Sequence, residues 1–232
     1  NGLGSDEQIH QALSSINAHS DKKSIYLNAD LRVVEEIEQM MSTYNQDNPL
    51  DILINCAGMQ VAKPLADMPT SAWNDIIAIN LSAVFHTMRL SLPTMSEHGF
   101  GRVINIASVH GLVASANKAP YVASKFGLVG LSKAAALEYA KVGTRQSGAV
   151  TVNCICPGWV ETPLIEPQIN ARAEMFEGNR EIGIQELLKE KQPSLRMSLP
   201  EEIADTAVWL CRREAHNITG ASIPIDGAWT AQ

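Results

Sequence analysis

GRVINIAS (101–108), YVASKFGLVGLSKAAALEYAKVG (121–143) and AVTVNCICPG (149–158) follow one another in the middle of the chain. The first and third segments are short, continuous apolar runs, as in strands that are buried on both faces. The segment between them is longer, and its apolar residues recur at helical spacing. A strand, a helix and a second strand in this order join neighbouring parallel strands. This part of the chain therefore predicts a parallel sheet.

The same alternation continues on both sides of this unit. We expect strands at 24–30, 50–58 and 219–227 and helices at 31–45, 71–99 and 199–215, the helix at 71–99 stopping at Gly99. The segment 159–198 is the least patterned part of the chain. With no linker, repeat or low-complexity tract, residues 1–232 are predicted to form one α/β domain with a doubly wound, Rossmann-like parallel sheet. Ligands of such sheets bind beyond the carboxyl ends of the strands, where the strand order reverses.

Composition excludes several classes of function. The 232 residues carry a net charge of −7, which disfavours nucleic acid and membrane surfaces as partners because both attract basic faces. No apolar run approaches the ~20 residues of a membrane span, and the first residues lack the pattern of a signal peptide. The four cysteines show no metal-ligand spacing, so we expect no metal, and packed, reduced thiols in the cytoplasm. Cys154 and Cys156 should share one face of their strand.

Small and polar residues gather where the predicted strands end. NCAG (55–58) follows one strand, Ser108 closes the next, and CPGW (156–159) closes a third. Just beyond Ser108, Tyr121 and Lys125 stand four residues apart and so share a helix face. A tyrosine has a pKa near 10, and a neighbouring ammonium group favours its ionised form. Ser108 can donate to an oxygen on which charge develops. These residues predict proton transfer at an oxygen atom.

The order and spacing of five motifs resemble the short-chain dehydrogenase/reductase family. The motifs are NCAG (55–58), INLS (79–82), Ser108, YVASK (121–125) and PGWVETP (157–163), and the resemblance runs along the whole chain. It implies a catalytic set of Asn80, Ser108, Tyr121 and Lys125. In that set Tyr121 is the base and Asn80 holds a water that links Lys125 to solvent.

The resemblance also implies NAD as the cofactor. Its binding residues would be Leu3, Asp30, Leu31, Asn55, Ala57, Gly58, Tyr121, Lys125, Pro157, Gly158, Val160, Thr162 and Leu164. Asp30 would accept from the adenine amino group. An NADP enzyme favours an arginine near the ribose 2′ position, and NGLGSDE (1–7) has no basic residue.

The resemblance is strongest to members that interconvert (R)-3-hydroxybutyrate and acetoacetate. It implies that Gln60, His110, Lys118 and Gln168 bind the substrate carboxylate, while Trp159 and Trp229 wall the pocket. Residues 159–198 would form a lid over the substrate, and the protein would be a homotetramer.

One departure from the family concerns the start of the sequence. The family's first strand, Gly-rich loop and first helix have no counterpart before NGLG (1–4), and the loop at 141–152 is longer than usual. Loss of a central strand would expose strand edges and apolar surface. Two alternatives therefore stay open: a related enzyme with a sugar or 3-oxoacyl substrate, and an inactive scaffold of the same fold.

Overall fold

The protein forms one parallel four-stranded sheet. The computed structural model describes residues 1–2, 4–44 and 48–231. In the sheet order β1-β2-β3-β4, the strands are β1 (Ile52–Asn55), β2 (Phe100–Ile106), β3 (Ala149–Pro157) and β4 (Ser222–Ile225). The predicted strands at 50–58, 101–108, 149–158 and 219–227 are thus confirmed within a few residues at each end.

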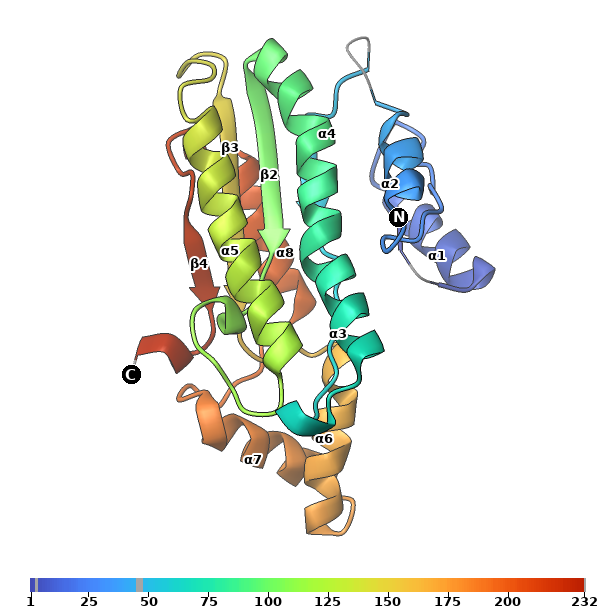
Figure 1. Ribbon diagram of the computed structural model, residues 1–232, viewed down its shortest axis with the longest axis vertical. Coiled ribbons are helices and arrows are strands. Elements are labelled where there is room, and N and C mark those ends of the chain that lie inside the picture. Colours follow the sequence, from blue (N-terminus) through green and yellow to red (C-terminus); the bar gives the residue numbers. More distant parts are fainter. Residues whose placement is uncertain (3, 45–47, 232) are drawn as a thin grey trace.

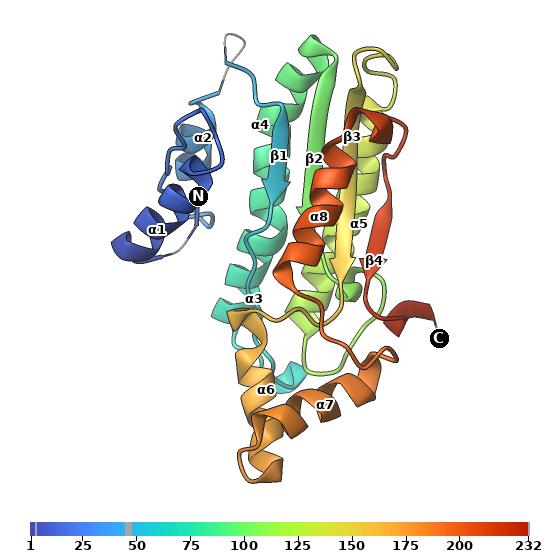
Figure 2. The same cartoon turned by 180° about the vertical axis from the view of Figure 1, so that it is seen from behind.

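Helices cover both faces of this sheet, as Figures 1 and 2 show from opposite sides. On one face lie α4 (Ala83–His98) and α5 (Ala119–Tyr139), and on the other lies α8 (Pro200–Cys211). Alternate strand residues serve the two faces: Val103 belongs to the hydrophobic cluster under α4 and α5, whereas Ile104 packs with α8. Cys154 and Cys156 both lie in the first cluster, as expected for one strand face. The α/β fold with a parallel sheet is confirmed.

The four described strands follow chain order. One expectation about the strands is wrong. The segment 24–30 is not a strand, because it lies beside α1 and α2, away from the edge strand β1 (Figures 1 and 2). The carbonyls of Leu27 and Ala29 accept hydrogen bonds from the Asn1 side chain, both at 3.0 Å, instead of from a neighbouring strand. On β1, Ile52 and Ile54 stay 41% and 50% exposed.

The first helices differ from the sequence expectation. Helix α1 (Asp6–Asn17) was not predicted, although Ser5 and Gln8 form the capping box that favours a helix start. Helix α2 (Val34–Met41) is shorter than the predicted 31–45, since the Asp30 carbonyl accepts from the Val33 amide in a turn before it. Residue 45 lies outside the described residues. Helix α2 packs on α4 through Ile37 and Met41.

The predicted helix at 71–99 is continuous but not uniform. It comprises α3 (Thr70–Ile77), one π-helical turn (Ala78–Ser82) and α4, and it ends at Gly99, whose φ of 67° suits glycine. By length and composition alone, Thr70–His98 could cross a membrane, which the sequence reading excluded. Its buried residues include Ile76, Val84, Met88 and Leu92, which pack within the domain. We therefore assign it to the core.

The segment 159–198 is more ordered than its sequence suggested. It forms α6 (Glu166–Ala173) and α7 (Arg180–Lys191), which pack on each other beyond the carboxyl ends of the strands (Figure 1). Ile169, Leu187 and Leu188 join these helices to Trp159 and Trp229 in one hydrophobic cluster. This packing places α6 and α7 beside the predicted site.

Candidate active site

A cavity of about 800 Å³ opens at the carboxyl edge of the sheet. That volume lies within the range of small-molecule sites. Its walls come from β1 from its first residue onward, the carboxyl ends of β2 and β3, the first turns of α5, residues 157–165 and one side of α8. The wall between β1 and α8 is apolar and includes Ile52, Ile54 and Val208. Polar groups are concentrated at the other end, near Ser108 and Tyr121.

Ser108 and Tyr121 lie together at that polar end. Ser108 follows β2 and caps a short 3₁₀ turn (Val109–Gly111), where its Oγ accepts from the His110 amide at 3.1 Å. Tyr121 lies in the first turn of α5, which begins at Ala119 and has Pro120 as its second residue. Burial raises the pKa of Tyr121, and a hydrogen bond with Ser108 opposes that rise. The structure therefore brings the predicted pair together.

Lys125 lies one helical turn further along α5. Its ammonium group is 5.7 Å from the centre of the Tyr121 ring and donates to the Ile106 carbonyl at 2.8 Å. Burial lowers the pKa of Lys125 to about 8, against the opposing influence of three thiols, that of Cys56 first. The ammonium form is thus held by a backbone carbonyl rather than by a carboxylate.

Asn80 sits in the π-helical turn and is fully buried. Its amide group donates to the Met59 carbonyl at 3.0 Å and to Ser124 Oγ at 3.1 Å, and its oxygen accepts from the Met59 amide at 2.9 Å. The side chain therefore ties the segment after β1 to α5. Gly58 lies close by, since a Cβ there would be 3.6 Å from Asn80 Oδ1 and 3.8 Å from Lys125 Nζ. That Asn80 holds a water linking Lys125 to solvent remains a prediction.

Two tryptophans wall the polar end, as predicted. The Trp159 and Trp229 rings are 8% and 7% exposed, and their centres are 5.8 Å apart. The His110 ring meets Trp229 and Tyr121 edge-on, with ring centres 5.5 and 5.9 Å apart. The space next to Tyr121 is thus bounded by aromatic rings, and closing a site to water strengthens the polar contacts made in it.

Lys118 is the residue immediately before α5. Its side chain reaches the aromatic corner, the part of the cavity bounded by His110, Trp159 and Trp229. Its ammonium group lies 4.9 Å from the centre of a Trp159 ring. Burial lowers the pKa of Lys118 to about 8, Lys191 lowers it further, and Glu190 opposes them. Among the described residues, no carboxylate lies within ion-pair distance of Lys118. The corner thus holds a partly desolvated cation that needs an anionic partner.

His110 is neutral over the physiological pH range. Burial lowers its pKa to about 4, with Lys118 as the next cause. Its Nδ1 lies 3.2 Å from the Val113 carbonyl, which can only accept, so we assign the ring hydrogen to Nδ1. Nε2 is then an acceptor, and donation to a carboxylate would require the other tautomer or a protonated ring.

The two predicted glutamines are placed differently. Gln60 lines the cavity, and its amide group donates to the Leu164 carbonyl at 3.2 Å. Gln168 stands on α6 and is not among the lining residues. Its Oε1 is buried without a hydrogen-bond partner among the described residues. The structure therefore brings Gln60 to the cavity with Ser108, His110, Lys118 and Tyr121, but not Gln168.

Most of the predicted cofactor residues surround the cavity. Those that line it are Gly58, Tyr121, Lys125, Pro157, Gly158, Val160, Thr162 and Leu164. Asn55 does not line it, because its amide group donates to Asn105 Oδ1 at 2.8 Å and its oxygen accepts from Thr87 at 2.9 Å. Asn55 thereby joins β1 to β2 and α4. Ala57 is exposed, and Leu3 lies outside the described residues.

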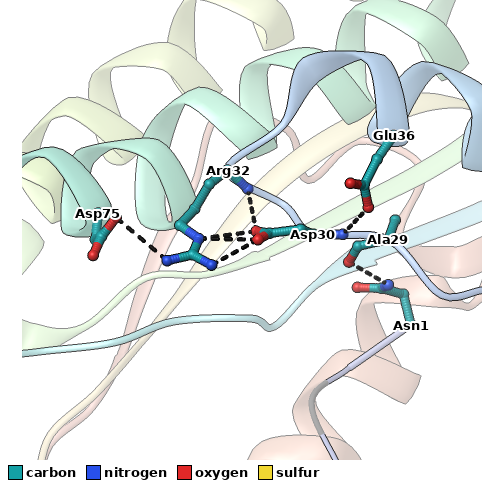
Figure 3. Close-up of polar contacts among 6 residues, drawn as sticks. All are labelled: Asn1, Ala29, Asp30, Arg32, Glu36 and Asp75. Atoms are coloured by element: carbon teal, nitrogen blue, oxygen red, sulfur yellow. Dashed lines mark hydrogen bonds and ion pairs between the residues drawn. The ribbon is translucent and has the colours of Figure 1, made fainter.

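The predicted adenine residues, Asp30 and Leu31, do not line the cavity. Figure 3 shows Asp30 with its polar contacts. Arg32 donates to both carboxylate oxygens of Asp30, with Nη2 2.7 Å from Oδ2, and also lies 3.6 Å from Asp75 on α3. Hydrogen bonds from Arg32 hold the pKa of Asp30 at about 2. Leu31 packs into the cluster between α2 and α4. This corner is exposed, and its charges are paired.

Comparison with known proteins identifies the family to which these features belong. A family model for short chain dehydrogenase matches residues 3–173. The chain belongs to the short-chain dehydrogenase family. It is therefore an oxidoreductase with the fold of that family, and the inference drawn from the five motifs is confirmed.

The relatives agree with the narrower resemblance. The chain is 47% identical to the D-beta-hydroxybutyrate dehydrogenase of Cupriavidus necator over 89% of this chain and 78% of that protein. It is 41% identical to the enzyme of the same name from Rhizobium meliloti, over 100% and 88% of the two chains. An actinorhodin polyketide ketoreductase solved with NADPH has a TM-score of 0.86 and 30% identity, over 98% of this chain and 85% of that one. Family and fold support a nicotinamide dinucleotide as the class of cofactor.

The sequence reading missed residues that support the site from α7. Gln192 follows α7 and is 1% exposed, and its Oε1 accepts from the Trp159 amide at 3.0 Å. A Cβ on Gly158 would lie 2.6 Å from the same Oε1, so this close approach requires glycine. Cys56, predicted to be packed, is exposed and lines the cavity because it follows the last residue of the short strand β1. Nothing in the local pattern of EKQPS (190–194) indicates that Gln192 is buried.

Proposed function

We propose that the protein interconverts (R)-3-hydroxybutyrate and acetoacetate, with NAD as the cofactor. The observation that carries this proposal is the position of Lys118. A half-buried ammonium, with no carboxylate partner among the described residues, shares one cavity with Ser108 and Tyr121. A substrate with a carboxylate near a secondary alcohol can meet the cation with one end and the Ser108–Tyr121 pair with the other. The two relatives named for this activity support the same substrate.

The proposed reaction is an alcohol oxidation with balanced transfer of a proton and a hydride. Tyr121 Oη, as the phenolate, accepts the proton of the substrate hydroxyl while the carbinol C–H bond breaks and the C=O bond forms. A bound nicotinamide ring supplies the acceptor for the hydride. Ser108 Oγ donates to the substrate oxygen and positions it. Lys125 keeps positive charge beside Tyr121, and we expect Asn80 and a water to carry the proton onward.

The preference for NAD is proposed from the charges near the predicted adenine corner. Of the described residues at 1–7, none is basic. Arg32, the basic residue nearest Asp30 in the sequence, is paired with Asp30 and Asp75. A 2′-phosphate there would lack a free cationic partner, and burying an unpaired charge is costly. We therefore expect kcat/KM to favour NAD over NADP by at least about tenfold.

The direct test is the oxidation of both enantiomers of 3-hydroxybutyrate with NAD and with NADP. We expect turnover of the (R) enantiomer with NAD, and a loss of at least about 100-fold in kcat for Tyr121→Phe, the size of a general acid–base contribution. Binding of NADH to Tyr121→Phe, followed by fluorescence, should persist. Turnover of sugars or 3-oxoacyl thioesters in preference to the hydroxy acid would support the related-enzyme alternative. NADH binding without turnover of any of these substrates would support the scaffold.

A further inference from the structure

Lys191, the last residue of α7, reaches the aromatic corner from outside the cavity. Its ammonium group lies 5.9 Å from the centre of a Trp229 ring and donates to Ser115 Oγ at 3.3 Å. Lys118 lies over the neighbouring ring of Trp159 in the same corner. Lys191 is not among the cavity-lining residues, whereas Trp229 is. Two ammonium groups thus contact the two rings of one aromatic pair.

Neither ammonium group has a carboxylate partner within the described parts of the chain. Glu190, the nearest acid in the sequence, is engaged by Arg172 of α6. Contacts with aromatic faces stabilise a cation only in part. Like charges brought together in a partly buried place repel, so the pair is most stable when an anion lies between or beside them. The corner therefore has more positive charge than a neutral substrate needs.

The field of Lys191 reaches two groups that face the cavity. It lowers the pKa of Lys118; burial is the larger cause, and Glu190 acts in the opposite direction. It also lowers the pKa of His110, for which burial and Lys118 are the larger causes. Lys118 has three titratable neighbours among the described residues: Lys191 and Glu190 on α7, and His110 in the turn after β2. Lys191 therefore acts on Lys118 and His110 through its charge.

We propose that Lys191 is a positioning residue for the substrate carboxylate, adding positive potential to the anion site of Lys118 through the Trp229 wall. This inference rests on the proposed function. It assigns the selectivity for an acid over a neutral alcohol to two lysines on different elements, one before α5 and one at the end of α7. The second lysine acts without touching the substrate.

The proposal predicts two effects of opposite sign when Lys191 is replaced. Positive potential at the carboxylate falls, so Lys191→Met should raise KM for (R)-3-hydroxybutyrate by about 2- to 10-fold with kcat little changed, the size expected of a half-exposed charge. Removing a neighbouring cation also raises the pKa of Lys118. The decline of kcat/KM at alkaline pH, where Lys118 loses its proton, should therefore move to higher pH.

Matched variants separate charge from packing. Lys189→Met is the control, because Lys189 lies on the same helix, is exposed and pairs with Glu186, away from the corner. Lys191→Arg should restore most of the affinity for the acid. Ser115→Ala removes the hydrogen bond that joins α7 to the loop before α5 but keeps the charge, so it should leave KM for the acid near that of the wild type.

The methyl ester of the substrate decides between the outcomes. For Lys191→Met, we expect no change in KM for the ester, which lacks the negative charge. Equal losses on acid and ester, or an unchanged KM and alkaline limb for the acid, would overturn the role of Lys191. Either result would be seen in an enzyme that oxidises the hydroxy acid, so the proposed function would stand. Failure of the wild type to oxidise the acid would instead overturn the proposed function.

Discussion

The aromatic corner and the predicted adenine corner differ in whether their charged side chains have partners. In the aromatic corner, Lys118 is half-buried over the Trp159 ring and has no carboxylate partner among the described residues. At the predicted adenine corner, the Asp30 carboxylate remains open to solvent with 36% of its side chain exposed, and the exposed Arg32 engages both its oxygens. A desolvated charge without a partner is costly in the free protein and gains most when a ligand pairs with it. An exposed, paired charge has little left to gain.

This difference indicates where the selectivity of the enzyme resides. An anionic substrate group relieves the cost of burying Lys118, so the aromatic corner should discriminate strongly between substrates. At the adenine corner, a cofactor must compete with the Arg32–Asp30 ion pair and with water, so this corner should contribute modestly to cofactor affinity. Substitutions at the aromatic corner should therefore cost clearly more than substitutions at the adenine corner.

The largest effect is expected from Lys118→Met. The variant loses a charged hydrogen bond in a desolvated pocket, which costs about 2–4 kcal/mol, or roughly 30- to 1000-fold in kcat/KM for the hydroxy acid. The methyl ester should be affected little. Lys133→Met, at an exposed position on α5, is the control for charge and helix stability. If acid and ester lost the same factor, the aromatic corner would not be the carboxylate site.

An intermediate effect is expected from pH. Lys118 must be protonated to bind a carboxylate, and its pKa in the free protein is about 8. The ratio of kcat/KM for acid to that for ester should therefore be constant below about pH 7 and fall up to about tenfold per pH unit above 8. Ionisation of Tyr121 and Lys125 affects both substrates and cancels in the ratio.

A ratio that does not change with pH would show that Lys118 does not bind the substrate carboxylate. This conclusion would hold even if Lys118→Met were inactive for other reasons. Steady-state rates between pH 6 and 10 suffice for this measurement. In Lys118→Met the ratio should lose its pH dependence, which links the titration to that side chain.

The smallest effect is expected from Asp30→Asn. Asparagine can still accept one hydrogen bond from Arg32 but is neutral, so we expect KM for NAD to rise about 2- to 5-fold, the size of an exposed polar contact. KM for the hydroxy acid should not change. Asp21→Asn, at an exposed position, is the control. A loss comparable to that of Lys118→Met would show that the adenine corner is buried in the complex and would remove the proposed contrast.

Local patterns were enough to predict the central part of the fold. Continuous apolar runs separated by helical periodicity predicted β1 to β4, and Gly99 marked a helix end, because these features depend on neighbours in sequence. The strand predicted at 24–30 was wrong because an apolar run becomes a strand only when another strand lies beside it to pair its backbone groups. The helices of 159–198 were not expected, since their apolar residues are few and are buried only against each other and the tryptophans.

Much of the site followed from strand ends and from motif spacing, and the rest required three-dimensional contacts. Ser108, Tyr121 and Lys125 could be placed together because a parallel sheet brings its carboxyl ends to one edge and residues four apart share a helix face. The burial that raises the pKa of Tyr121, and the hydrogen bond with Ser108 that opposes it, depend on how the folded chain packs around both side chains. The convergence of Lys118 and Lys191 on two tryptophans joins residues separated by more than seventy positions. Only the packing of α7 against α6 and the two tryptophans decides it, because no pattern in a linear chain records which distant charges will lie beside the same rings.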